Sequence, residues 1–147
     1  MMSHPSRRAL LGFALLLPGP AAAARINAER GIAVRGTDVV AYFEEGRPRP
    51  GLAAHAFEWN GARWLFATAA HRDAFAADPM RYAPAYGGFC SWAVSQGYTA
   101  PVDPNAWKIV QGRLYLNYDR SVQRRWERDI AGHIQRADAN WPRLEQE

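Results

Sequence analysis

The feature that most constrains the fold is the dipeptide Asn60-Gly61, which lies inside the segment 55–67. Every second residue before it is aromatic or histidine, and apolar alternation resumes after it. Asn-Gly readily adopts the positive φ angles that a two-residue turn between antiparallel strands requires. The segment 55–67 is therefore predicted to form an antiparallel hairpin. A second pair of apolar runs, 107–110 and 113–118, surrounds Gln111-Gly112 and predicts another hairpin.

Helical patterns follow both hairpins. Residues 68–76 begin with a capping threonine and precede Asp78-Pro79, which favours a short helix. From Asp119 onward apolar residues recur with a period of 3.6, which predicts an amphipathic helix to about residue 139, stopped by Asn140-Trp141-Pro142. Hairpins interspersed with helices that are not βαβ crossovers predict an α+β fold. It has a small antiparallel sheet and a long C-terminal amphipathic helix.

The first 24 residues have the pattern of a signal peptide. Arg7-Arg8 precede a short apolar stretch and a run of small residues that ends at Ala24. The stretch is too short to span a bilayer as a permanent helix. The paired arginines resemble a twin-arginine export signal, with ordinary secretion as the alternative. We expect residues 1–24 to be removed and residues 25–147 to form one periplasmic or secreted domain without a membrane span.

Charge argues against nucleic-acid binding. The chain has 18 Lys+Arg and 14 Asp+Glu, and residues 1–24 take away two arginines and no acid, which leaves 16 basic and 14 acidic residues. A nucleic-acid interface requires basic residues clustered on one face. The densest basic group lies between residues 120 and 128, where it fits the solvated face of a helix. No nucleic-acid partner is predicted.

Five segments carry a pattern beyond secondary structure: 35–43 (RGTDVVAYF), 59–66 (WNGARWLF), 78–90 (DPMRYAPAYGGFC), 107–118 (WKIVQGRLYLNY) and 137–142 (ADANWP). Together they resemble the YHS-domain family, in the version found in exported bacterial proteins. The resemblance covers nearly all of the chain after its first 24 residues. It implies an association with heavy-metal handling. The cysteines that shorter metal-associated members carry are missing here, so those ligands are not carried over.

Cys90 is the single cysteine. It follows Gly87-Gly88 and precedes a stretch that is predicted to be helical up to Gly97. The first turn of a helix favours the thiolate, which is a nucleophile and a soft metal ligand. Candidate partners are His71, after the first hairpin, and His55, at its start. Thiolate with imidazole favours copper, zinc or iron, so the first hypothesis is a metal-binding or metal-handling module. The alternative for the thiol is simple packing in the core.

Aromatic residues crowd around the glycine loop and suggest a second hypothesis. They can form a core of large rings or the walls of a pocket with Cys90 at its base. The predicted pocket residues are Tyr86, Gly87, Gly88, Phe89, Trp92 and Trp107. Such a module would bind a small molecule or a partner segment without a cofactor. No acidic pair or Ser-His-Asp pattern predicts an enzyme, and a Cys–His nucleophile is the third alternative.

Overall fold

A computed structural model describes Gly12 and residues 24–147. The predicted signal peptide therefore lies outside the described residues, except for Gly12 and Ala24. None of the helices in the described part has the length and apolar character that crossing a membrane requires.

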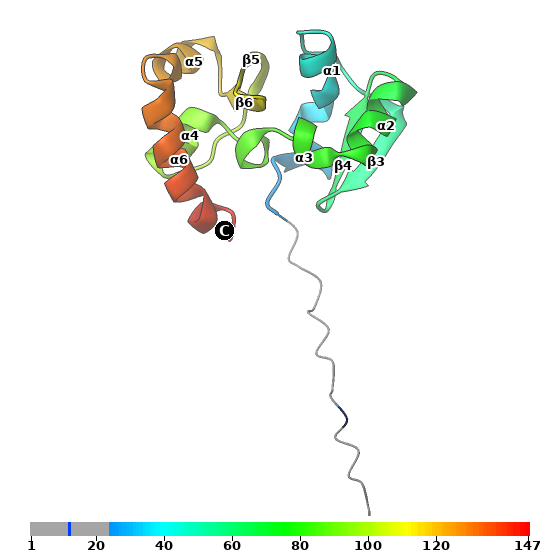
Figure 1. The fold of residues 1–147 in the computed structure, drawn as a ribbon, viewed down its shortest axis with the longest axis horizontal. Coiled ribbons are helices and arrows are strands. Elements are labelled where there is room, and N and C mark those ends of the chain that lie inside the picture. Colours follow the sequence, from blue (N-terminus) through cyan, green and yellow to red (C-terminus); the bar gives the residue numbers. More distant parts are fainter. Residues whose placement is uncertain (1–11, 13–23) are drawn as a thin grey trace, which may run out of the picture.

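The chain forms helices around two separate sheets (Figure 1), which confirms the predicted α+β class. The first is a four-stranded mixed sheet of order β1-β2-β4-β3, in which β2 and β4 are parallel. The second is the antiparallel pair β5-β6. The strands are β1 (Ala28–Glu29), β2 (Ile32–Ala33), β3 (Leu52–Trp59), β4 (Ala62–Phe66), β5 (Asp103–Val110) and β6 (Arg113–Asn117).

The helices divide between two halves of the molecule. The helices are α1 (Val39–Glu44), α2 (Ala69–Ala77), α3 (Pro79–Tyr82), α4 (Ser91–Gln96), α5 (Arg120–Glu127) and α6 (Ile130–Leu144), with short 3-10 turns η1 (Val34–Gly36) and η2 (Ala85–Gly88). In Figure 1, α1 and α2 lie on the right with the four-stranded sheet, and α4, α5 and α6 lie on the left with β5 and β6. We call these the N-terminal and C-terminal halves.

Both predicted hairpins are present, and both turns have the expected conformation. Asn60 and Gly61 have φ of 49° and 73°, and Gln111 and Gly112 have 50° and 76°. Two consecutive positive φ angles define the turn whose twist matches antiparallel strands. Arg30-Gly31 makes a third such turn, which sequence analysis missed because each flanking strand has only two residues.

Phe75 explains why α2 packs on the first hairpin. Its side chain is fully buried, and its ring centroid lies 5.1 Å from that of Trp64 and 5.0 Å from that of Phe66. The rings of Phe57 and Trp59 contact it edge-on from β3. Burial of large rings in such offset and edge-to-face contacts stabilises the N-terminal half.

The predicted helix over 119–139 is interrupted. Helix α5 ends at Glu127, and α6 begins at Ile130 after Asp129, whose Oδ1 accepts a hydrogen bond from Gly132 N at 3.1 Å. The apolar stripe continues across the break, so periodicity alone did not reveal it. The long C-terminal helix is confirmed as α6, although its start was predicted too early.

The predicted stop at Asn140-Trp141-Pro142 is wrong, because α6 continues to Leu144. Tertiary contacts outweigh the lost backbone donor of the proline. The ring of Trp141 packs 6.1 Å from that of Tyr86, and the Leu144 side chain is buried. Asn140 Nδ2 donates to Val94 O at 2.9 Å, which ties α6 to α4.

Residues 25–27 fill the space beside the glycine loop. Asn27 N donates to Gly87 O at 2.8 Å, and Asn27 Nδ2 donates to Gly88 O at 3.0 Å. Gly87 has φ of +62°, and a Cβ atom there would collide with the carbonyl oxygen of Arg25. The two glycines therefore allow close backbone approach, as expected, but the approaching segment belongs to the same chain.

We expect Gly87→Ala to lower the free energy of unfolding by about 2–5 kcal/mol, because it adds the collision with Arg25 to the strain of a positive φ. Gly112→Ala is the matched control, since Gly112 has φ of +76° and open space at its Cβ position. It should cost only about 1–2 kcal/mol. Urea unfolding of the variants measures both losses. Equal losses would contradict the proposed role of the close approach.

Candidate functional site

Cys90 connects the start of α4 to the end of β6. It is the residue before α4, and its side chain is 1% exposed. Its Sγ accepts a hydrogen bond from Tyr118 N at 3.3 Å and lies 3.6 Å from Asn117 Oδ1. The same Asn117 oxygen accepts from Trp92 N at 3.1 Å. The thiol is therefore held in place by groups from both elements.

Burial raises the pKa of the Cys90 thiol, and the charge of Asp119 raises it further. The backbone N–H groups of Ala93, Tyr118 and Trp92 lower it, as a helix start was expected to do. Desolvation is the larger effect, because a buried thiolate loses its hydration. Of the two alternatives for Cys90, burial therefore favours the neutral, packed thiol over the thiolate.

A small apolar pocket of about 230 Å³ lies over Cys90. Its walls are aromatic or small apolar side chains: Trp92, Ala93, Tyr98, Ala100, Tyr118 and Val122. Two of these, Tyr98 and Tyr118, are 49% and 52% exposed, although large aromatic side chains are usually better covered. We call this the Cys90 pocket.

The predicted pocket residues do not line one common cavity. Trp92 lines the Cys90 pocket, but Tyr86 and Gly87 line a smaller cavity of about 140 Å³ next to Arg25 and Trp141. Trp107 lines a hollow beside α5.

The remaining two predicted pocket residues pack against other parts of the chain. Phe89 packs against Trp141, and Gly88 lies against Val34. Contacts with residues 25–27 and with α6 thus direct the predicted pocket residues between 86 and 92 to different places, although they are close in sequence.

Tyr86 is part of the interface with α6. Its hydroxyl donates to Asp138 Oδ1 at 2.8 Å, and the Arg113 guanidinium lies 5.4 Å from its ring centroid. Burial is the main cause that raises the pKa of Tyr86, and the hydrogen bond to Asp138 adds to it. The hydroxyl is therefore a fixed donor to Asp138.

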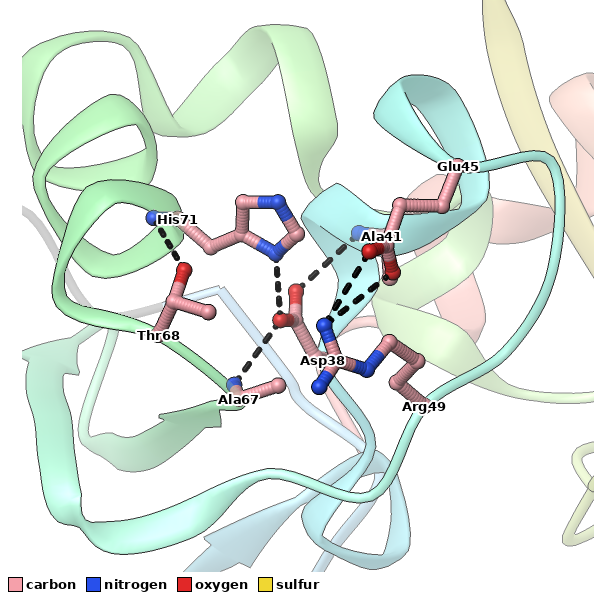
Figure 2. Close-up of polar contacts among 7 residues, drawn as sticks. All are labelled: Asp38, Ala41, Glu45, Arg49, Ala67, Thr68 and His71. Atoms are coloured by element: carbon pink, nitrogen blue, oxygen red, sulfur yellow. Dashed lines mark hydrogen bonds and ion pairs between the residues drawn. The ribbon is translucent and has the colours of Figure 1, made fainter.

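His71 pairs with an aspartate and is far from Cys90. Figure 1 places α2 and α4 on opposite sides of the molecule. The His71 Nδ1 atom lies 2.7 Å from Asp38 Oδ2 (Figure 2). Since a carboxylate only accepts hydrogen bonds, Nδ1 carries the proton. The other ring nitrogen points away from Asp38 in Figure 2.

Asp38 is a buried residue that sequence analysis missed. Its side chain is fully buried, and it accepts from Ala41 N at 3.1 Å and from Ala67 N at 2.9 Å in addition to His71 (Figure 2). It therefore joins the start of α1, the end of β4 and α2. Its position directly before the apolar run 39–43 was the available signal, because aspartate there is a favourable helix cap.

The other histidines lie elsewhere. His55 is half-buried on β3, and its Nδ1 has no hydrogen-bond partner in the described structure. His133 is buried on α6 with Nδ1 2.9 Å from Ser95 Oγ, and burial lowers its pKa. Within residues 24–147, no group of three or more His, Cys, Asp or Glu side chains could hold a metal ion. Cys90, His71 and His55 do not form such a group in the described part of the chain. Metal binding at Cys90 is not tested by this observation and stays a prediction.

Comparisons with known proteins do not indicate a function. No family model, curated protein or solved structure matches the chain. The resemblance to the YHS-domain family stays a prediction, carried by the five segments described above.

The raised pKa of Cys90 predicts a loss of stability at alkaline pH. The unfolded chain loses the thiol proton near its ordinary pKa of about 9, whereas the folded protein retains it. The stabilisation is complete below that value and is lost as pH rises through the pKa of the folded state. Subtracting the Cys90→Ala unfolding curve from that of the unmodified protein should therefore give a difference that begins to fall as pH approaches the ordinary thiol pKa and keeps falling until pH passes the raised pKa of the folded state. A difference independent of pH would contradict the prediction.

Asp38→Ala should lower the free energy of unfolding by about 3–5 kcal/mol, because it leaves three buried or partly buried donors without an acceptor. Asp119→Ala is the matched control, since Asp119 also caps a helix but accepts only one local bond, from Val122 N. It should cost about 1 kcal/mol. Thermal and urea unfolding measure both. Similar losses would show that Asp38 is only a cap.

Proposed function

We propose that this protein is an exported binding module and that its site is the Cys90 pocket, which takes a small molecule with an aromatic or apolar group. The observation that carries the proposal is the pocket of about 230 Å³ between Trp92, Tyr98 and Tyr118. This size suits a single ring or a small fused ring system, because typical pockets for larger ligands begin at about 300 Å³.

Aromatic walls give such a ligand both affinity and orientation. The rings of Trp92 and Tyr98 are perpendicular, with centroids 6.3 Å apart, so a ligand ring can stack on one and meet the edge of the other. The tyrosine hydroxyl groups can hydrogen-bond a polar substituent at the entrance. Burial of the half-exposed rings of Tyr98 and Tyr118 would add hydrophobic stabilisation.

Cys90 contributes a neutral thiol to the base of this pocket. A polarisable sulfur favours contact with an aromatic ring. Its Sγ accepts a hydrogen bond from Tyr118 N and donates one to Asn117 Oδ1, and these contacts fix the position of the thiol. The geometry therefore supports binding better than nucleophilic catalysis.

We also propose that the protein belongs to the YHS-domain family and acts in the periplasm. The sequence segments that resemble this family support the first part, and the signal-like residues 1–24 support the second. The metal-handling function that the resemblance implies, with copper, zinc or iron on Cys90, is the alternative to be tested against the pocket.

A calorimetric titration of the purified protein with p-cresol tests whether the Cys90 pocket binds an aromatic ligand. We expect saturable binding that Ala100→Leu abolishes, because the larger side chain fills the cavity. Ala139→Leu is the matched control on the exposed surface of α6 and should leave binding unchanged.

Three results would contradict the pocket proposal: no saturable binding, an unchanged affinity in Ala100→Leu, or an equal loss in Ala139→Leu. Elemental analysis of protein purified from its native compartment tests the alternative. Copper, zinc or iron that is lost in Cys90→Ala would favour metal handling.

A further inference from the structure

A hollow of about 580 Å³ lies between the two halves of the molecule and away from the Cys90 pocket. Its lining comes from Arg35, Thr37 and residues 48–50 of the N-terminal half and from residues 103–105 of the C-terminal half. It shares no lining residue with the Cys90 pocket. We call it the central groove.

Backbone hydrogen bonds hold the first wall of the central groove rigid. The segments 36–38 and 49–51 run antiparallel, with Thr37 opposite Pro50. Asp38 N donates to Arg49 O at 2.9 Å, and Gly51 N donates to Gly36 O at 2.8 Å. The buried Asp38 side chain anchors the same wall to α2. Side chains on this wall are therefore presented from a fixed backbone.

The second wall of the central groove consists of residues 103–105. Two hydrogen bonds fix this part of the chain against the N-terminal half. The Tyr42 hydroxyl donates to Pro104 O at 2.6 Å, and Arg35 Nη1 donates to Val102 O at 3.3 Å. Tyr42 is buried on α1, so the contact is protected from water. The groove is thus preformed, which lowers the entropic cost of ligand binding.

Backbone strain sets the position of Arg35. Val34 and Arg35 have φ of 46° and 56°, and a β-branched residue such as valine is strongly disfavoured there. Val34 tolerates this conformation because it is fully buried and its N–H donates to Asn27 O at 2.8 Å. Strain of this kind concentrates at functional sites.

The charges that line the central groove favour an anion. Arg35 and Arg49 contribute two guanidinium groups, whereas Asp103 contributes one carboxylate. Arg49 already pairs with Glu45 outside the lining, at 3.1 Å, but no carboxylate pairs with Arg35 in the described part of the chain. Asp103 Oδ1 accepts a hydrogen bond from Asn105 N at 2.9 Å, which partly stabilises the negative charge of the carboxylate.

We propose that the central groove binds the oxyanion of a small molecule, a carboxylate or a phosphate, on Arg35 and Arg49. Guanidinium groups present paired N–H donors that match both oxyanions. Thr37 and Asn105 line the same groove, and their side chains carry a hydroxyl and an amide that could supply further donors. The negative charge of Asp103 repels an anion in the groove, so a ligand with a small negative charge is favoured.

The test is an NMR titration of the protein with inorganic phosphate and, separately, with acetate, at constant ionic strength. Saturable shifts of the amide signals of residues 35–37 and 103–105 are expected with at least one anion, and the tighter one identifies the oxyanion. Arg35→Gln and Arg49→Gln should each weaken binding at least about fivefold, since each removes a charge-assisted hydrogen bond. Asp103→Asn should tighten it.

The matched control is Arg124→Gln, which removes an exposed arginine of α5 and should change the affinity less than about twofold. Ala100→Leu should also leave anion binding unchanged, so this proposal and the Cys90 pocket fail independently. Arg35→Lys covers the case in which Arg35→Gln does not fold, because it keeps the charge and should bind with intermediate affinity. Absence of saturable binding, or an equal loss in Arg124→Gln, would overturn the proposal.

Discussion

The close approach of residues 25–27 to Gly87-Gly88 is the constraint on which both proposed sites depend. On one side it fixes η2, which leads directly into Cys90 and α4. On the other side Asn27 O accepts the N–H of Val34 and so holds the strained turn that positions Arg35. The Arg25 guanidinium also donates to Leu144 O, at 3.1 Å, which brings in the end of α6. A short segment thus links the two halves and sets the geometry of the Cys90 pocket and the central groove.

Local features of the fold could be predicted from the sequence, because they depend on a few neighbouring residues. The turns at Asn60-Gly61 and Gln111-Gly112 and the cap at Thr68 are examples. The pairing of Asp38 with His71 could not, since 33 positions separate them and their contact arises only from tertiary packing. The thiol of Cys90 shows the same limit. Its place at a helix start was predicted, but the opposing effect of burial depends on α4 and β6 together.

The two sites differ in chemistry and position. The Cys90 pocket is small, apolar and built within the C-terminal half, whereas the central groove is larger, charged and shared by both halves. An apolar pocket selects its ligand by shape and desolvation, and paired guanidinium groups select by charge and hydrogen-bond geometry. The neutral thiol fits the first kind of site, because an ionised sulfur would lose its hydration there.

A crystal structure of the protein grown with p-cresol tests the central claim most directly, because it shows where the ligand lies. We predict density for the ring between Trp92, Tyr98 and Tyr118, above the Cys90 sulfur, with the hydroxyl toward the two tyrosines. A ring bound elsewhere with the pocket empty, or a metal ion on the Cys90 sulfur in its place, would contradict the account.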